Sequence, residues 1–317
     1  PFLIIRSNIY EKSNYIIFRH QSIMNTQNVY ILEDRAIIYI NGKDAKKFLQ
    51  NLISNDIEKV NETNSCFASL LTPQGKYLFD FIITKHKSGY FIDCERIQAD
   101  AFFKQLSIYK LRSNVEIMNL SNEFVIAVFS REKFLKFENA KDQPGNTIKY
   151  REDSILLDPR NKDLGARLII NLEKLNLSLK KLELKISKID EYYKLSHKLG
   201  IAQKNMNKLQ NKLFGIECNF EELNGIDFKK GCYVGQENTA RIKLKNKLSK
   251  RLLPVQLISG KLNEGETIYT NGVAIGKILI NSEIPFALIR YLDDNFKDDT
   301  ELKSENGVLR IKEPNWI

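Results

Sequence analysis

The chain has 317 residues, 43% of them hydrophobic, and a formal net charge of +10 at pH 7. Apolar runs such as residues 125–129 are far shorter than the ~20 residues that a membrane helix needs, so we predict no membrane span. Its 4 cysteines include no Cys-x-x-Cys pair and only 3 histidines accompany them, which argues against a disulfide framework or a zinc site, so we predict no bound metal.

The positive charge alone is weak evidence for a nucleic-acid partner. The lysines are scattered through a chain that is also rich in Asn and Ile, and we find no zinc finger, no RNP-type strand and no Arg-rich run. Nonspecific attraction to phosphate is the most that follows.

We expect residues 1–23 to be an N-terminal extension that is disordered or lies upstream of the true start, because Met24 is a candidate initiator. The extension carries basic residues and one acid, Glu11, and so resembles a mitochondrial transit peptide. The cysteine usage predicts a reducing compartment. We therefore expect the bacterial cytoplasm, or the mitochondrial matrix if the source is eukaryotic.

The first third of the chain predicts short strands, a helix and an antiparallel meander. An apolar stripe with one-turn spacing runs from Ala45 to Ile53 and predicts the helix. β-Branched and aromatic runs that end at turn residues predict the strands. The predicted strands are residues 29–32, 36–40, 65–71, 77–85 and 90–93.

Further along, the pattern stays mixed, which indicates an α+β fold. Residues 175–189 combine period-two leucines with helix-forming lysines, and we interpret them only as a lysine-faced surface element. From residue 248 onward, short strands separated by turns predict a small β-barrel. The other predicted elements are helices over 97–111 and 192–199 and strands over 115–118, 124–129, 154–157 and 168–172.

The most informative stretch is residues 229–241, in which Cys232 lies between Gly231 and Gly235. Both glycines allow sharp turns, so we expect the thiol to be presented rather than buried, and Lys229 and Lys230 to favour its thiolate form. A buried cysteine beside solvated lysines is the alternative. Glu237 and Arg241 lie four residues apart, the helical spacing at which opposite charges pair, and so predict a loop that runs into a helix.

The run from Lys230 to Glu237, Lys-Gly-Cys-Tyr-Val-Gly-Gln-Glu, resembles the signature of the YgfZ-type folate-binding proteins, which are relatives of the glycine cleavage aminomethyltransferase, or T protein. The resemblance implies a T-protein-like folate-binding fold, a ring of three parts with a central folate cleft. We expect this region over residues 24–245, in two α+β subdomains of roughly 24–120 and 121–245, and the barrel over 246–317. Further similar segments are residues 40–45 with 48–50 and 55–56, and residues 72–76, 158–160, 164–167 and 219–228.

The resemblance also implies site residues and a cofactor. The cofactor would be tetrahydrofolate or another reduced folate. In the aminomethyltransferases paired acids follow the turn matched by residues 72–76, but here the first is Phe79 and only the second, Asp80, is acidic. Two alternatives are open. Asp80 could be a solvent-facing residue of an amphipathic hairpin, and Glu217 and Arg241 could each belong to an ordinary surface ion pair. The implied folate-binding residues are Asp80, Glu217, Gln236 and Arg241, and the functional loop comprises Cys232 with Lys230, Gly231, Tyr233, Gly235, Gln236 and Glu237.

The function implied is a folate-dependent factor for the assembly, maintenance or repair of iron-sulfur clusters in client enzymes, including tRNA-modifying enzymes. Its partners would be these clients or assembly proteins, with tRNA reached indirectly, and we expect a monomer. One alternative is an aminomethyltransferase of the glycine cleavage type, against which Phe79 and the cysteine loop argue. A second is a tRNA-binding accessory module, which rests on charge alone. A single cysteine cannot hold a cluster that needs four ligands, so other ligands must come from elsewhere.

Overall fold

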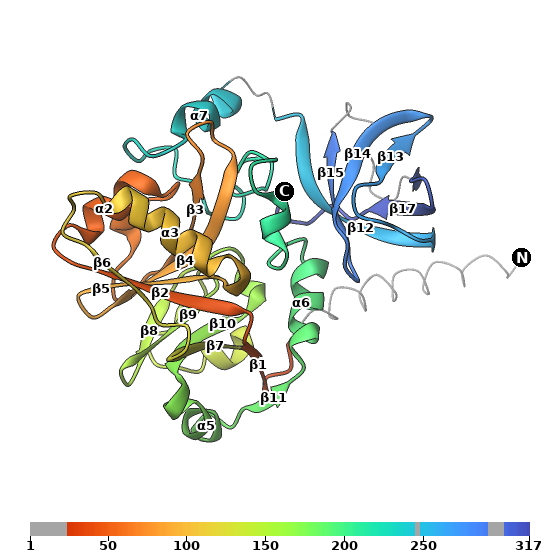
Figure 1. Ribbon diagram of the computed structural model, residues 1–317. Helices are drawn as coiled ribbons and strands as arrows, with labels where there is room; N and C mark the ends of the chain where they lie inside the picture. The colour runs from red at the N-terminus through yellow and green to blue at the C-terminus, as the bar shows by residue number, and fades with distance from the viewer. Residues whose placement is uncertain (1–23, 245–247, 291–300) are drawn as a thin grey trace, which may run out of the picture.

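The computed structural model describes residues 24–244, 248–290 and 301–317 (Figure 1). The predicted extension, residues 1–23, lies outside the described residues. Two open sheets with their helices form one part of the molecule, and a barrel lies beside them. Within the described ranges, no helix has the length and hydropathy needed to cross a bilayer.

The first sheet has 5 antiparallel strands in the order β3-β4-β5-β2-β6 and is covered by two helices, α2 (Ala45–Leu52) and α3 (Ala99–Lys110). The predicted apolar stripe of α2 is buried against this sheet, because Phe48, Leu49 and Leu52 join the same core as Phe102 of α3. The strands are β2 (Arg35–Asn41), β3 (Cys66–Leu71), β4 (Tyr77–His86), β5 (Gly89–Glu95) and β6 (Glu116–Asn119).

The second sheet has 6 strands in the order β11-β1-β7-β10-β9-β8. The ambiguous stretch 175–189 divides into the end of a helix, α5 (Leu172–Lys181), and a short edge strand, β11 (Lys185–Ser187). β11 pairs in parallel with β1 (Asn28–Leu32), so the strand that precedes the first sheet in sequence belongs to the second sheet. The remaining elements are β7 (Phe124–Phe129), β8 (Thr147–Tyr150), β9 (Asp153–Leu157), β10 (Ala166–Asn171), α4 (Arg131–Phe134) and α6 (Ile189–Lys198).

The C-terminal strands close a barrel in the order β12-β15-β14-β13-β16-β17, seen at the right of Figure 1. This confirms the predicted small β-barrel. Its interior is filled by branched aliphatic side chains such as Val255, Ile278 and Leu309. The strands are β12 (Lys250–Gly260), β13 (Thr267–Thr270), β14 (Val273–Ile280), β15 (Phe286–Arg290), β16 (Glu301–Lys303) and β17 (Gly307–Ile311).

A long connection, residues 199–235, joins α6 to the last helix, α7 (Gln236–Leu244), and holds the two sheets and the barrel together. It contains little regular structure beyond the 3-10 turn η4 (Met206–Leu209). Its apolar side chains, including Leu213 and Phe220, share one core with residues of both sheets and of the barrel. The connection that leads to the cysteine motif is therefore the centre of the fold.

A buried chain of ion pairs also joins the two sheets. Asp93 of β5 accepts from Arg35 Nε at 2.6 Å and from Arg167 Nη1 of β10 at 2.7 Å. Arg167 Nε also donates to Asp158 Oδ2 at 2.8 Å, and Arg160 Nη2 donates to the same oxygen at 2.7 Å. Burial alone would raise the pKa of Asp158, but the two arginines hold it far below its ordinary value. Because each charge is paired, removal of one partner would strand a buried charge.

Candidate functional site

Cys232 is exposed at the tip of a short loop that is anchored on both sides. Lys230 on one side is 7% exposed and Tyr233 on the other is 8% exposed, whereas Gly231 and Cys232 between them are open to solvent. α7 begins three residues after Tyr233, which confirms the predicted loop that runs into a helix. The loop therefore presents one thiol on a short, firmly held turn.

Lys230 is the anchor on the N-terminal side. Its Nζ donates to the backbone oxygens of Gln50 at 2.8 Å, Ile53 at 2.6 Å and Asn55 at 2.8 Å. An ammonium has three donors, so all of them are used. Burial lowers the pKa of Lys230 to about 8, and the group is therefore still charged at pH 7. We expected Lys230 to act beside the thiol, but its ammonium is held by the carbonyls at the end of α2.

Gly235 is the anchor on the C-terminal side. The expectation that both Gly231 and Gly235 form sharp turns is correct only for Gly235. Gly235 has a φ of +84°, and a Cβ on it would lie 2.5 Å from the backbone oxygen of Thr72. Gly231 has no positive φ, and a Cβ on it would meet nothing within 4 Å. Only Gly235 is required by backbone geometry. The turn at residues 72–76 therefore packs directly against the cysteine loop, so two segments of the proposed signature meet.

The charged residues of α7 lie on its surface, whereas Thr239 is buried. Arg241 Nη2 donates to Asn238 Oδ1 at 2.6 Å, while Asn238 Nδ2 reaches the backbone oxygen of Gln74 at 2.9 Å. Among the described ion pairs, the expected pair of Glu237 with Arg241 does not occur, and both side chains are exposed. Gln236 is half-buried at the start of the helix.

Asp80 lies apart from the cysteine loop, inside the first sheet. It is 6% exposed, and its Oδ1 accepts a hydrogen bond from the Tyr77 hydroxyl at 2.7 Å. The interpretation of Asp80 as a solvent-facing hairpin residue is therefore wrong. Burial, followed by the charge of Asp80, raises the pKa of Tyr77 well above its ordinary value, so Tyr77 remains a donor. Nearby, Gln98 Nε2 donates to Glu95 Oε2 at 2.7 Å, which extends a buried polar group at this end of the sheet.

Glu217 has a structural partner. Its Oε2 accepts from the backbone N–H of Phe214 at 2.8 Å and so closes a turn of the long connection. The side chain is half-buried and forms no ion pair within the described ranges, so the surface ion-pair alternative does not apply to it. The structure brings neither Glu217 nor Asp80 into hydrogen-bond contact with Gln236 or Arg241 of α7.

The other three cysteines are buried. Burial raises the pKa of Cys66 and of Cys94 to about 12 and raises the pKa of Cys218 well above its ordinary value. The shielding of Cys66 and Cys94 agrees with their positions in apolar runs, whereas Cys218 is buried although it lies between Glu217 and Asn219 in the sequence. In the part of the chain that the structure describes, no group of three or more His, Cys, Asp or Glu side chains is placed to hold a metal ion.

Residues after α2 fasten the segment that leads into the loop, and the sequence motif alone did not single out this role. Ser54 Oγ donates to the backbone oxygen of Gly225 at 2.6 Å, and Asn55 Nδ2 donates to that of Asn224 at 2.7 Å. Asp227 pairs with Lys59 at 2.7 Å. The available signal was that the segment containing Asn55 also resembles the family.

Comparisons with known proteins identify the relatives of the chain. No protein-family model matches it. A Neurospora crassa protein named iron-sulfur cluster assembly factor IBA57 homolog, mitochondrial, is 31% identical over 238 residues, which cover 70% of this chain and 52% of the relative. Mouse IBA57 is 25% identical over 309 residues, or 90% and 84% of the two chains. The tRNA-modifying protein YgfZ of Buchnera aphidicola is 28% identical over 255 residues, or 76% of each chain.

The chain spans only part of the length of several relatives. The matches cover 52%, 61% and 55% of three fungal and slime-mould IBA57 relatives. Aminomethyltransferase T of the glycine cleavage system from Bartonella henselae superposes with a TM-score of 0.73, covering 95% of this chain and 89% of that chain at 13% identity. This confirms the predicted aminomethyltransferase-like fold.

Proposed function

We propose that this homologue of the IBA57 and YgfZ proteins assists the assembly, maintenance or repair of iron-sulfur clusters in client enzymes, including enzymes that modify tRNA. The observation that carries the proposal is the exposed Cys232 thiol on a loop that is held on either side by two buried side chains, those of Lys230 and Tyr233. The names of the relatives, cluster assembly factor and tRNA-modifying protein, support this class of function.

The loop suits transient ligation or transfer better than storage of a cluster. Cluster iron is usually held by four thiolate-type ligands, and the other three cysteines are buried away from solvent. Cys232 would therefore supply one ligand or one sulfur-handling thiol, and the client or an assembly protein would supply the rest. A rigid loop lowers the ordering cost of such an encounter.

We also propose that the chain binds tetrahydrofolate or another reduced folate. A pterin ring needs a flat slot with carboxylate or amide groups facing its N–H donors. The buried carboxylate of Asp80, already oriented by Tyr77, is chemically suited to that role. The side-chain amide of Gln236 is suited to an amide of the same ligand, and the exposed guanidinium of Arg241 to its carboxylate. Glu217 is the weakest of the four proposed folate-binding residues, because its carboxylate already accepts from the backbone N–H of Phe214. When bound, the folate would supply its one-carbon chemistry.

The setting of the protein follows as a further part of the proposal. Relatives named as mitochondrial and a bacterial YgfZ fit either the mitochondrial matrix or the bacterial cytoplasm. We propose a monomer with client enzymes or assembly proteins as its partners, and tRNA approached through them. Catalysis of aminomethyl transfer is the second candidate function, because the chain shares the fold of that enzyme. Against it, Phe79 stands at the position of the first acid of that enzyme and is buried against Phe102, with ring centroids 4.9 Å apart.

The test is genetic. The chain should restore the activity of an iron-sulfur enzyme in a bacterial strain that lacks its own YgfZ-type protein. Cys232→Ser should abolish this rescue, whereas Lys180→Met, a change at an exposed residue of α5 on the other sheet, should not. Full rescue by Cys232→Ser at wild-type protein levels would mean that the loop is structural and that the proposal is wrong.

A further inference from the structure

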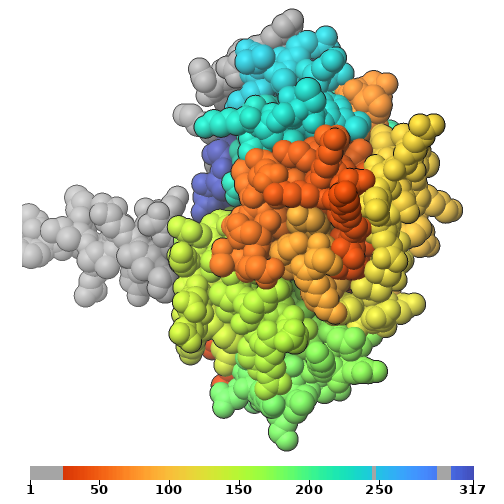
Figure 2. Space-filling model, turned by 90° about the vertical axis from the view of Figure 1, so that its left-hand side faces the viewer, coloured from red at the N-terminus to blue at the C-terminus, as the bar shows by residue number. Residues whose placement is uncertain are grey.

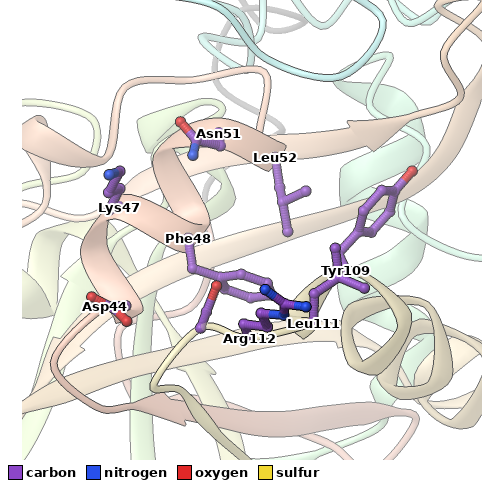
Figure 3. A pocket seen from close by; sticks show the side chains of 9 residues that line it. Asp44, Lys47, Phe48, Asn51, Leu52, Tyr109, Leu111 and Arg112 are labelled. Atoms are coloured by element: carbon purple, nitrogen blue, oxygen red, sulfur yellow. The ribbon is translucent and has the colours of Figure 1, made fainter.

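A groove of about 790 Å³ lies between α2 and the C-terminal end of α3, and the function proposed above does not use it (Figure 3). In the close-up, the side chains of Phe48 and Leu52 from α2 face those of Tyr109 and Leu111 across the hollow. Lys47 and Arg112 also line it. The groove thus has apolar walls and a cationic rim.

Leu111 is the clearest evidence that a partner covers the apolar part of the groove. It is 86% exposed and directly follows α3, with a φ of +43° that a leucine rarely adopts. Ile108, one turn earlier on α3 and outside the groove lining, is also 64% exposed. Glycine is the usual residue for a positive φ at a helix end, so a strained, exposed leucine there is poorly explained by folding. Exposed apolar side chains that lie close together, such as Leu111 and Ile108, are typical of a binding surface.

The charges at the groove favour an acidic occupant. Among the residues that the structure describes, neither Lys47 nor Arg112 is in an ion pair, and Lys104 and Lys110 of α3 are also unpaired. The acid in the lining is Asp44, and its Oδ2 already accepts from the backbone N–H of Asn114 at 2.8 Å. The local field is therefore positive, and the cations remain available for carboxylates.

The two ends of α2 connect the groove to different parts of the fold. At the start of α2, the backbone N–H of Asp44 donates to the oxygen of Asn114 at 3.1 Å and joins the helix to the segment after α3. At the other end of α2, the carbonyls of Gln50 and Ile53 hold Lys230. Figure 1 likewise shows the segment before α7 close to these two helices. A chain lying in the groove would thus be directed toward Cys232.

We propose that this groove binds a short, acidic, amphipathic segment of a client protein and so brings the cluster-binding residues of the client to Cys232. The inference rests on the proposed function for the nature of the client. Apolar residues of the segment would cover Leu111 and the exposed edges of Phe48 and Leu52, and its carboxylates would meet Lys47 and Arg112, as in other helix-in-groove complexes. Single-stranded RNA would instead need several open aromatic faces on which successive bases stack, whereas of the two aromatic residues in the lining only Tyr109 is partly exposed and Phe48 is 5% exposed.

Site-specific photo-crosslinking in the complemented cells tests the inference. A benzophenone amino acid would replace Asn51, an exposed residue of the groove lining, and in a control Leu177, which is 55% exposed on α5 of the other sheet. We expect adducts at position 51 to map to an acidic, amphipathic segment of an iron-sulfur protein, with little at position 177. Lys47→Glu combined with Arg112→Glu should lower the adduct yield roughly tenfold, because like charges then face the segment.

Other outcomes overturn the inference. These are adducts only to nucleic acid or lipid, equal protein adducts at both positions, or a yield that the double charge reversal leaves unchanged. Cys232→Ser separates this inference from the proposed function, because it should stop rescue but leave the crosslink intact. If Cys232→Ser rescues fully and the mapped crosslink persists, the proposed role of the loop fails while the groove remains a protein-binding site. If the crosslink is missing while Cys232→Ser is inactive, only the groove inference fails.

Discussion

Gly75 and Gly235 pack backbone against backbone, although 160 positions separate them in the numbering of the chain. A Cβ on Gly75 would lie 3.1 Å from the backbone oxygen of Gly235, and a Cβ on Gly235 would lie 3.1 Å from the Cα of Gly75. Both residues have positive φ, of +80° and +84°. This contact joins the turn between β3 and β4 to the loop that carries Cys232, so the thiol is positioned by the first sheet.

We predict that Gly235→Ala destabilises the fold by about 2 kcal/mol or more, because the added methyl group meets the Thr72 carbonyl and the positive φ is strained. Gly231→Ala is the matched control in the same loop. It should change the free energy of unfolding by less than about 0.5 kcal/mol, because its site is open. Urea denaturation measures both, and equal effects would contradict our account of the loop.

We predict that Lys230→Met lowers the free energy of unfolding by about 1–3 kcal/mol, because three backbone carbonyls lose their shared donor. Lys229→Met, at the exposed neighbouring position, should have little effect. Loss of the anchor should also increase the proteolysis of residues 226–235 in the folded protein. If Lys229→Met and Lys230→Met behave alike in denaturation, the ammonium does not hold the loop.

We predict that Cys232 is alkylated roughly 100-fold faster than Cys66 or Cys94 at pH 7.5. The two buried thiols have pKa values raised to about 12 and react only after local opening. Timed iodoacetamide labelling of the folded protein with mass-spectrometric readout gives the rates. Labelling in denaturant is the control, since the difference should then disappear. Comparable rates in the folded state would show that Cys232 is not presented.

We predict that tetrahydrofolate raises the melting temperature and that Asp80→Asn weakens its binding about tenfold or more, because a charged acceptor is lost. Asparagine keeps an oxygen that can accept from Tyr77, so the fold should persist. Asp100→Asn, an exposed acid on α3, should bind like the wild type. Isothermal calorimetry measures the affinities. The absence of both heat and thermal stabilisation at millimolar tetrahydrofolate would refute folate binding.

We predict that stability falls as the pH drops from about 6.5 to about 4. Burial lowers the pKa of His86 and of His197 to about 4 in the folded state. Between these pH values the unfolded chain binds more protons than the folded chain, so acid favours unfolding. His86 stacks on Phe91 with ring centroids 3.8 Å apart, so His86→Phe should keep the packing and flatten the decline. Melting temperatures between pH 7.5 and 4.5 test this, and an unchanged slope would contradict it.

Local patterns in the sequence were sufficient for much of the secondary structure. The stripe at Ala45, Phe48, Leu49 and Leu52 predicted α2, because a helix repeats every 3.6 residues and each member of the stripe is buried. Short strands and turns likewise predicted the barrel. Residues 147–150 were not predicted as a strand, since β8 is a 4-residue edge strand with little apolar pattern of its own.

The sequence by itself determined the family resemblance, the mixed α+β class and the position of the exposed cysteine, because these depend on neighbouring residues and on short periods. Tertiary structure alone decided where the side chains of the candidate site are directed. Lys230 bonds to Gln50 across 180 positions, and Asp80 is buried under Tyr77 rather than exposed on a hairpin. Such contacts arise when distant segments pack together, and no local period encodes which carbonyl a lysine will meet.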